Sequence, residues 1–212
     1  ATDVVPFVPI AGVTMAECVD MAHSLGRRVG RELEIPVYLY EEAATRPERR
    51  NLADVRRGEY EGLKLTIGTP ERAPDFGPPS VHPTAGATVI GARMPLIAFN
   101  VNLGTSDIET AKKIAKAVRG SSGGLVYVKA LGVMLEEKHV AQVSMNLVNY
   151  VKTPIHRVLE MVRREAARYG VAVIETELIG LTPLDAVLDT AAYYLQLPKL
   201  SRNQVIEARI WE

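Results

Sequence analysis

The chain is poor in cysteine, has no long apolar run, and carries no excess of charge of either sign. Cys18 is the single cysteine among 212 residues, which excludes an internal disulfide and a zinc site built from several thiolates. The 25 basic and 25 acidic side chains cancel, so no long-range field attracts nucleic acid or an acidic membrane surface. No segment approaches the roughly 18 apolar residues of a membrane-spanning helix. We therefore expect a cytoplasmic protein that binds neither nucleic acid nor membrane.

Common signatures of nucleotide and metal binding are also missing. The chain has no Gly-x-Gly-x-x-Gly fingerprint and no Gly-x4-Gly-Lys-Ser/Thr loop. Its four histidines lack the spacing of metal ligands, so no metal is expected. His23 and His156 fall on predicted helices and are expected at or near the surface, and His139 falls in a hairpin turn. Only His82 has a plausible ligand role.

The most informative segment is rich in proline and glycine and spans residues 73–86. Its four prolines remove backbone donors and fix φ, and its two glycines permit conformations that other residues avoid. Neither a helix nor a central strand is possible there, so a stiff loop is predicted. Loops of this length usually bind something or join two folding units, and the residues alone leave both interpretations open.

The chain divides into two halves of different character. In the first half, a strand at Val4–Val8 precedes a helix that opens with a Thr14-x-x-Glu17 capping box, and a strand follows at Val37–Tyr40. A charged, helical segment is expected over residues 47–63. These elements make too thin a sheet for an independent domain, so this half is predicted to be an incomplete α/β sheet.

The second half reads as strand, helix, strand, strand, helix, strand. Ser106 with Glu109 predicts the start of its first helix, and Thr153 followed by Pro154 predicts the start of the second. Thr182-Pro183 repeats this pattern for an added C-terminal helix. The order indicates a ferredoxin-like βαββαβ sandwich, and the whole chain is predicted to be an α/β (α+β) protein.

Alternation along these strands separates an apolar face from a polar one. Asn100 and Asn102 share the polar face with Gln142, Ser144 and Asn146 on a neighbouring strand, and Val173 is placed with Glu175 and Glu177. Such a face could be open to water, as in many antiparallel sheets, or could line a ligand cleft where amides supply donors and acceptors. Both interpretations remain open.

Several segments resemble the glutamate formimidoyltransferase (formiminotransferase) family, in order and over nearly the whole chain. They are residues 2–10 (TDVVPFVPI), 35–43 (IPVYLYEEA), 57–61 (RGEYE), 73–78 (APDFGP), 86–93 (GATVIGAR), 96–103 (LIAFNVNL), 135–144 (LEEKHVAQVS) and 178–184 (LIGLTPL).

The resemblance implies two α/β subdomains, residues 1–95 and 96–212, with folate held between them. It implies transfer of a formimino group from N-formimino-L-glutamate to tetrahydrofolate in histidine degradation, with tetrahydrofolate as co-substrate, no metal, and a homodimer. The segment that matches the family's folate-binding loop runs from Gly77 to Gly86. With two amides of the polar sheet face added, the expected substrate-binding residues are Gly77, Pro78, Pro79, Ser80, Val81, His82, Pro83, Thr84, Ala85, Gly86, Asn100 and Asn102.

No catalytic residue is assigned. The family's proton-accepting histidine lies in a His-Pro-Arg-x-Gly stretch that would fall before Ala1, and no histidine of this chain matches it. We therefore expect the chain to correspond to the later part of the N-terminal subdomain plus the whole C-terminal subdomain. Formyl transfer or cyclisation on 5-formyltetrahydrofolate, and an inactive fragment, remain alternatives. An RNA-recognition module is disfavoured because its sheet would carry stacked aromatics.

Overall fold

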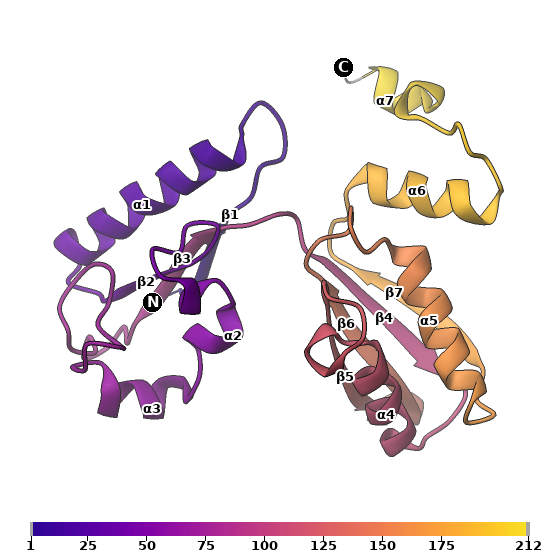
Figure 1. Ribbon diagram of the computed structural model, residues 1–212, viewed down its shortest axis with the longest axis horizontal. Coiled ribbons are helices and arrows are strands. Elements are labelled where there is room, and N and C mark those ends of the chain that lie inside the picture. The colour runs from indigo at the N-terminus through magenta and orange to yellow at the C-terminus, as the bar shows by residue number, and fades with distance from the viewer. Residues whose placement is uncertain (1, 211–212) are drawn as a thin grey trace. The chain divides into compact units, whose positions relative to one another are not determined.

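The computed structural model describes residues 2–210, which fold into two compact units (Figure 1). Unit 1 ends at Met94 and unit 2 begins at Pro95. Each unit has its own sheet and its own buried apolar side chains. Within residues 2–210, no helix combines the length and the apolar character needed to cross a membrane. The mixed α/β composition confirms the predicted fold class.

Unit 1 is a three-stranded parallel sheet with helices on both faces (Figure 1). The strand order is β1-β3-β2. α1 packs against one face and α2 with α3 against the other. The elements in chain order are β1 (Val4–Phe7), α1 (Met15–Glu32), β2 (Val37–Glu41), a 3-10 turn (Pro47–Arg49), α2 (Leu52–Val55), α3 (Glu59–Thr66) and β3 (Thr88–Ala92).

Local sequence explains where the helices of unit 1 begin and break. The Thr14 hydroxyl accepts from the Glu17 amide and the Glu17 carboxylate accepts from the Thr14 amide, which confirms the predicted capping box of α1. The predicted helix over residues 47–63 is instead divided into the 3-10 turn, α2 and α3. Gly58 stands between α2 and α3 with φ of +84°, a left-handed conformation that no continuous helix contains.

Unit 2 is a four-stranded antiparallel sheet with the order β5-β6-β4-β7. This is the strand order of a ferredoxin-like sandwich, in which the two βαβ halves interleave. Its elements are β4 (Ile97–Leu103), α4 (Ile108–Val118), β5 (Val128–Leu135), β6 (Val140–Leu147), α5 (Ile155–Ala167), β7 (Val173–Ile179), α6 (Leu184–Tyr194) and α7 (Ile206–Ile210), with 3-10 turns at Gly120–Ser122, Glu136–Lys138 and Arg202–Gln204.

The apolar face of this sheet holds one continuous core beneath α4 and α5. Alternate residues of β4 and β6 are buried there, as the sequence pattern predicts. The buried members on these strands are Ile97, Phe99, Val101, Leu103, Ala141, Val143, Met145 and Leu147.

β7 departs from the predicted alternation because of a bulge. Asn102 pairs with Glu175, but Leu103 pairs with Val173, so Ile174 is an extra residue on this strand. The bulge places Val173 against the apolar core instead of beside Glu175. The prediction for Val173 was therefore wrong.

Three predicted helix starts in unit 2 were also wrong, each by one residue. Asp107, not Ser106, caps α4, since its carboxylate accepts from the Glu109 amide at 2.9 Å and from the Thr110 hydroxyl at 2.6 Å. A carboxylate at this position also complements the positive end of the helix dipole. α5 and α6 begin after Pro154 and Pro183, which stand at the cap position in extended conformations and supply no side-chain acceptor.

Candidate functional site

The proline-rich loop begins as a short extension of the unit 1 sheet. Val37 donates its amide to the Phe76 carbonyl at 2.9 Å, and Asp75 donates its amide to the Val37 carbonyl at 2.9 Å. Residues 75 and 76 thus pair with the outer edge of β2. Backbone hydrogen bonds of this kind hold the start of the loop in one register.

A buried ion pair fixes this register from the side. The side chains of Arg49 and Asp75 are 5% and 7% exposed, and their N–O distance is 2.5 Å. Asp75 also accepts from the Leu39 amide at 2.8 Å and from the Thr45 hydroxyl, and Arg49 donates to the Ala73 carbonyl. Because a buried charge is tolerated only when it is paired and hydrogen-bonded, this cluster anchors residues 73–75 to β2.

Glycines let the loop pass close to two neighbouring segments. At Gly77, φ is +85° and an added Cβ would lie 2.6 Å from the Ile35 carbonyl oxygen. At Gly30 of α1, an added Cβ would lie 2.6 Å from the Gly77 nitrogen. Both positions therefore require glycine, and together they determine where the loop leaves the sheet.

The tip of the loop is a tight turn closed by reciprocal backbone hydrogen bonds. His82 donates its amide to the Gly86 carbonyl at 2.9 Å, and Gly86 donates to the His82 carbonyl at 3.0 Å. The His82 ring turns back over this turn, where its Nδ1 accepts from the Ala85 amide at 3.0 Å. Residues 77–86 are exposed or half-buried throughout, so their backbone groups and side chains remain accessible within unit 1.

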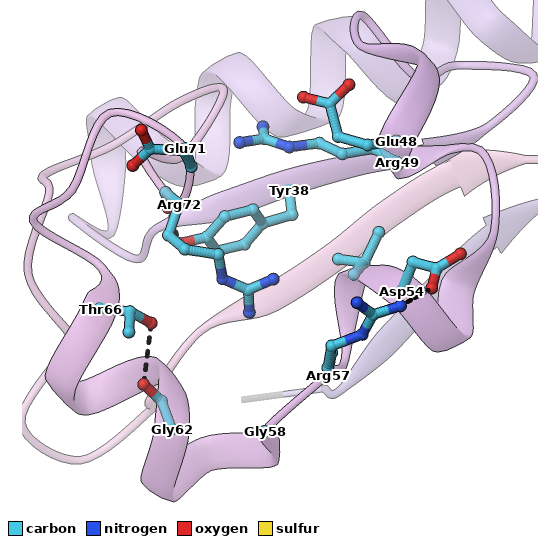
Figure 2. A pocket seen from close by; sticks show the side chains of 11 residues that line it. Tyr38, Glu48, Arg49, Asp54, Arg57, Gly58, Gly62, Thr66, Glu71 and Arg72 are labelled. Carbon is cyan, nitrogen blue, oxygen red and sulfur yellow. Dashed lines mark hydrogen bonds and ion pairs between the residues drawn. The ribbon is translucent and has the colours of Figure 1, made fainter.

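Two hollows lie on the α2 and α3 side of unit 1, next to the loop. The larger one, of about 620 Å³, contains equal numbers of acidic and basic side chains (Figure 2). Its lining residues are Tyr38, Glu48, Arg49, Asp54, Val55, Arg57, Gly58, Gly62, Thr66, Glu71 and Arg72. This mixture gives no net charge, so the hollow is not an anion site by charge alone.

Tyr38 forms the floor of the larger hollow between two guanidinium groups (Figure 2). Arg49 and Arg72 lie 5.0 and 5.9 Å from its ring centre, and its hydroxyl donates to the Arg72 carbonyl at 2.6 Å. Burial raises the pKa of the Tyr38 hydroxyl above its usual range, so Tyr38 is a neutral donor at neutral pH.

The second hollow, of about 430 Å³, shares Tyr38, Val55 and Arg72 with the first and reaches Ala87, directly after the loop. Tyr60 of α3 lines it, and the same ring would meet a Cβ added at Gly86 at 3.4 Å. The loop tip therefore lies beside the wall of this hollow. Sequence reasoning gave no ligand role to Tyr38, Tyr60 or Arg72, although Tyr38 and Tyr60 lie within family-like segments and Arg72 directly precedes one.

The two amides predicted on β4 have different surroundings in unit 2. Asn102 is 1% exposed; its amide group donates to Glu175 at 2.8 Å, and its oxygen accepts from Gln142 at 2.8 Å. Its hydrogen-bonding capacity is thus largely used inside the sheet. Asn100 is half-buried on the same face, opposite Ser144 and Glu177, and is the better placed of the two to meet a ligand.

The polar network around Asn102 extends to Lys138. This ammonium lies 3.4 Å from a carboxylate oxygen of Glu175 and from one of Glu177. Hydrogen bonds and charge from the two acids raise the pKa of Lys138, and the Asn102 amide and Lys138 lower the pKa of Glu175. Both groups are therefore charged at neutral pH.

The remaining histidines divide between surface and core. His139 occupies the β5–β6 turn with φ of +49°, as expected for a turn residue. His156 was predicted near the surface and is instead 7% exposed, stacked on Tyr193 with ring centres 4.3 Å apart. The helical pattern of α5 could not show this, because α6 covers the side of α5 that would otherwise face solvent. Across residues 2–210, no group of three or more His, Cys, Asp or Glu side chains is arranged to hold a metal ion.

Comparison with known proteins places the chain in one family along most of its length. Residues 1–93 match the formiminotransferase domain, N-terminal subdomain, and residues 98–210 match the formiminotransferase domain. A glutamate formimidoyltransferase from Streptococcus pyogenes serotype M1 is 54% identical over 208 residues, which is 98% of this chain and 70% of that protein.

Two further relatives agree with this assignment. A glutamate formimidoyltransferase from Thermoplasma acidophilum is 53% identical over 212 residues, covering 99% of this chain and 70% of its own length. The formimidoyltransferase-cyclodeaminase of Mus musculus is 48% identical over 206 residues, covering 94% of this chain and 38% of its own length. The chain belongs to the formiminotransferase family.

Proposed function

We propose that the protein transfers a formimino group from N-formimino-L-glutamate to N5 of tetrahydrofolate. The products are 5-formiminotetrahydrofolate and L-glutamate, and the reaction belongs to histidine degradation. The observation that carries this proposal is the 53–54% identity to two glutamate formimidoyltransferases over 98–99% of the chain. Tetrahydrofolate is the co-substrate, and the chemistry requires no metal.

In this reaction, N5 of the pterin attacks the amidine carbon, and a tetrahedral intermediate then expels glutamate. Holding the two substrates in contact can supply several kcal/mol of the barrier, on the order of 7–11 kcal/mol in well-oriented systems. The anchored loop suits this positioning role. Its start is fixed by the Arg49–Asp75 pair, its tip is closed by backbone hydrogen bonds, and its glycines let a flat ring approach the backbone.

We assign folate binding to residues 77–86 and test this with a glycine substitution. Gly77→Ala would bring a Cβ into contact with the Ile35 carbonyl and displace the loop. The expected result is at least about a tenfold rise in Kd for 5-formyltetrahydrofolate, measured by isothermal titration calorimetry on the whole chain. Gly123→Ala is the matched control, because it also has positive φ, at +91°, but its added Cβ meets nothing within 4 Å. Equal affinity of both variants would contradict the assignment.

We also assign a folate-contacting role to Asn100, and a smaller one to Asn102. Asn100→Ala should weaken binding of 5-formyltetrahydrofolate by about three- to tenfold, because an amide that pairs with the ligand is lost. Asn102→Ala should mainly perturb the Glu175 and Gln142 network, seen as faster amide exchange in β4 and β7. Unchanged folate affinity in Asn100→Ala would remove Asn100 from the site.

The activity itself is tested with a panel of donors. The complete protein, including any residues that precede Ala1, is incubated with tetrahydrofolate and either N-formimino-L-glutamate or N-formyl-L-glutamate, and separately with 5-formyltetrahydrofolate and ATP. Formation of 5-formiminotetrahydrofolate from the first donor is the expected result. Product from the second donor, or cyclisation of 5-formyltetrahydrofolate, would favour the alternative activities of the same scaffold. Absence of both folate binding and transfer would overturn the proposal.

The proposed function also bears on the cellular location and the oligomeric state of the protein. We propose a cytoplasmic homodimer, supported by the single buried cysteine and by large apolar side chains exposed on β7 and α6. Analytical ultracentrifugation that shows a monomer at micromolar concentration would exclude the dimer.

A further inference from the structure

The hydrogen bonds of the His82 ring determine which of its nitrogens carries a proton. Nδ1 accepts from the Ala85 amide at 3.0 Å and from the Thr84 amide at 3.3 Å. A backbone N–H can only donate, so Nδ1 must present a lone pair to both. The proton of the neutral imidazole is therefore on Nε2.

The Nε2 edge of the ring has a different environment. His82 as a residue is half-buried, and in the described part of the chain no hydrogen bond reaches Nε2. Because Nδ1 faces the turn of residues 82–86, Nε2 faces away from it. His82 thus presents one N–H outward from a turn whose backbone is closed by two hydrogen bonds.

This arrangement is unsuited to proton abstraction. A general base needs a free lone pair within reach of the proton that it removes. On His82, the lone pair of Nδ1 is occupied by the turn, and Nε2 carries hydrogen. Any use of His82 as a base would require the ring to give up both amide hydrogen bonds.

We propose that His82 is a hydrogen-bond donor that positions the reduced folate, through Nε2–H, and is not the proton acceptor of the reaction. The inference rests on the proposed folate-binding role of the loop. The acceptor on the ligand is an oxygen, either a pterin or benzoyl carbonyl or a glutamyl carboxylate, all of which reduced folates carry. The turn holds the ring in place, so little ordering is needed when the ligand binds.

Two substitutions test the roles of Nδ1 and Nε2 separately. In His82→Asn, the side-chain oxygen can replace Nδ1 as the acceptor of the turn, because Asn commonly accepts from the backbone two or three residues ahead. It is too short to replace Nε2. In His82→Gln, the terminal amide can reach the position of Nε2, but the turn loses its short acceptor.

Binding of 5-formyltetrahydrofolate to the whole chain is measured by isothermal titration calorimetry for both variants. We expect about a tenfold rise in Kd for His82→Asn, with unchanged amide exchange in residues 82–86, and a smaller rise for His82→Gln. The opposite order, with His82→Asn binding like the unmodified chain and His82→Gln binding weakly, would show that His82 only holds the turn. That outcome overturns the inference.

Transfer kinetics provide a second readout. In the complete protein, including any residues that precede Ala1, His82→Asn should raise KM for tetrahydrofolate and leave kcat within about twofold, because uniform binding is lost without loss of transition-state stabilisation. A fall in kcat of about 100-fold or more would identify His82 as the acid–base group and overturn the inference. Failure of the unmodified chain to bind folate would overturn the proposed function, whereas equal binding by His82→Asn would overturn the donor role alone.

Discussion

The two units stabilise their sheets in different ways. Unit 1 covers both faces of a parallel sheet, so β2 is buried from Val37 to Tyr40, and its outer edge is closed by the start of the loop. Unit 2 buries one face of an antiparallel sheet in a single apolar core and leaves amides and acids on the other. The loop edge of unit 1 should therefore depend strongly on its polar anchors, and unit 2 on side-chain packing.

The largest expected effect is loss of the buried ion pair in unit 1. Asp75→Asn leaves the Arg49 charge buried without its partner, which should cost about 3–5 kcal/mol of unit 1 stability. Hydrogen exchange followed by mass spectrometry measures opening of each unit separately. Peptides of β2 and residues 73–76 should lose protection while those of β4 and β6 keep it.

The exposed Arg56–Asp3 pair, with side chains 52% and 63% exposed, provides the control. Arg56→Met should change stability by no more than about 1 kcal/mol. Comparable losses from Asp75→Asn and Arg56→Met would mean that burial gives the Arg49–Asp75 pair no special importance.

In unit 2, truncation of a side chain should cost much more stability on the apolar face of the sheet than on the polar face. Leu103→Ala removes a fully buried side chain from the core and should cost about 2–5 kcal/mol. Leu131→Ala, at a position that is 64% exposed on the polar face, should cost less than about 1 kcal/mol. Urea denaturation of both variants measures the difference, and similar losses would show that the polar face is packed in solution.

A smaller effect is expected where α1 meets the loop. Gly30→Ala places a Cβ 2.6 Å from the Gly77 nitrogen, and the resulting backbone shift should cost about 1–3 kcal/mol. Gly62→Ala in α3 meets nothing within 4 Å and should instead stabilise by up to about 1 kcal/mol through helix propensity. Melting temperatures that rise for both variants would mean that the loop does not pack on α1 as described.

The smallest effect concerns pH and is expected in unit 2. Burial lowers the pKa of His156 below 6.5, although Asp189 at 3.7 Å opposes this shift. The folded state therefore binds fewer protons than the unfolded state, and the stability of unit 2 should fall as the pH drops below about 6.5.

His156→Phe keeps an aromatic ring next to Tyr193 but cannot take up a proton. Urea denaturation at pH 7.5 and pH 5.5 should show a larger loss for the unmodified chain than for His156→Phe. An equal loss would exclude His156 as a source of the acid sensitivity.

Local patterns predicted the elements that short-range physics controls. The Thr14 capping box, the alternation on β4 and β6, and the irregular loop at residues 73–86 all depend on residues close together in sequence. The predicted start of α4 was wrong by one residue because Asp107, a better hydrogen-bond acceptor, stands next to Ser106. The prediction for Val173 was wrong because a bulge depends on how the neighbouring strand pairs, which the local sequence does not show.

The candidate site was predictable to a smaller extent. Resemblance and composition both pointed to residues 77–86, but the sequence could not show that Arg49 and Asp75, 26 positions apart, form the anchor of that loop. It could not distinguish Asn100 from Asn102, because the partners that occupy Asn102 come from β6 and β7. The protonated edge of the His82 ring also depends on backbone amides whose orientation only the folded turn fixes.

The sequence by itself determined the family, the ferredoxin-like order of unit 2 and the irregular loop at residues 73–86, because these follow from motif order, periodicity and proline content. Tertiary structure alone decided which polar groups are already paired and which remain available. Hydrogen bonding and desolvation depend on distances of a few ångströms between segments remote in the chain, and a linear pattern carries no record of those distances.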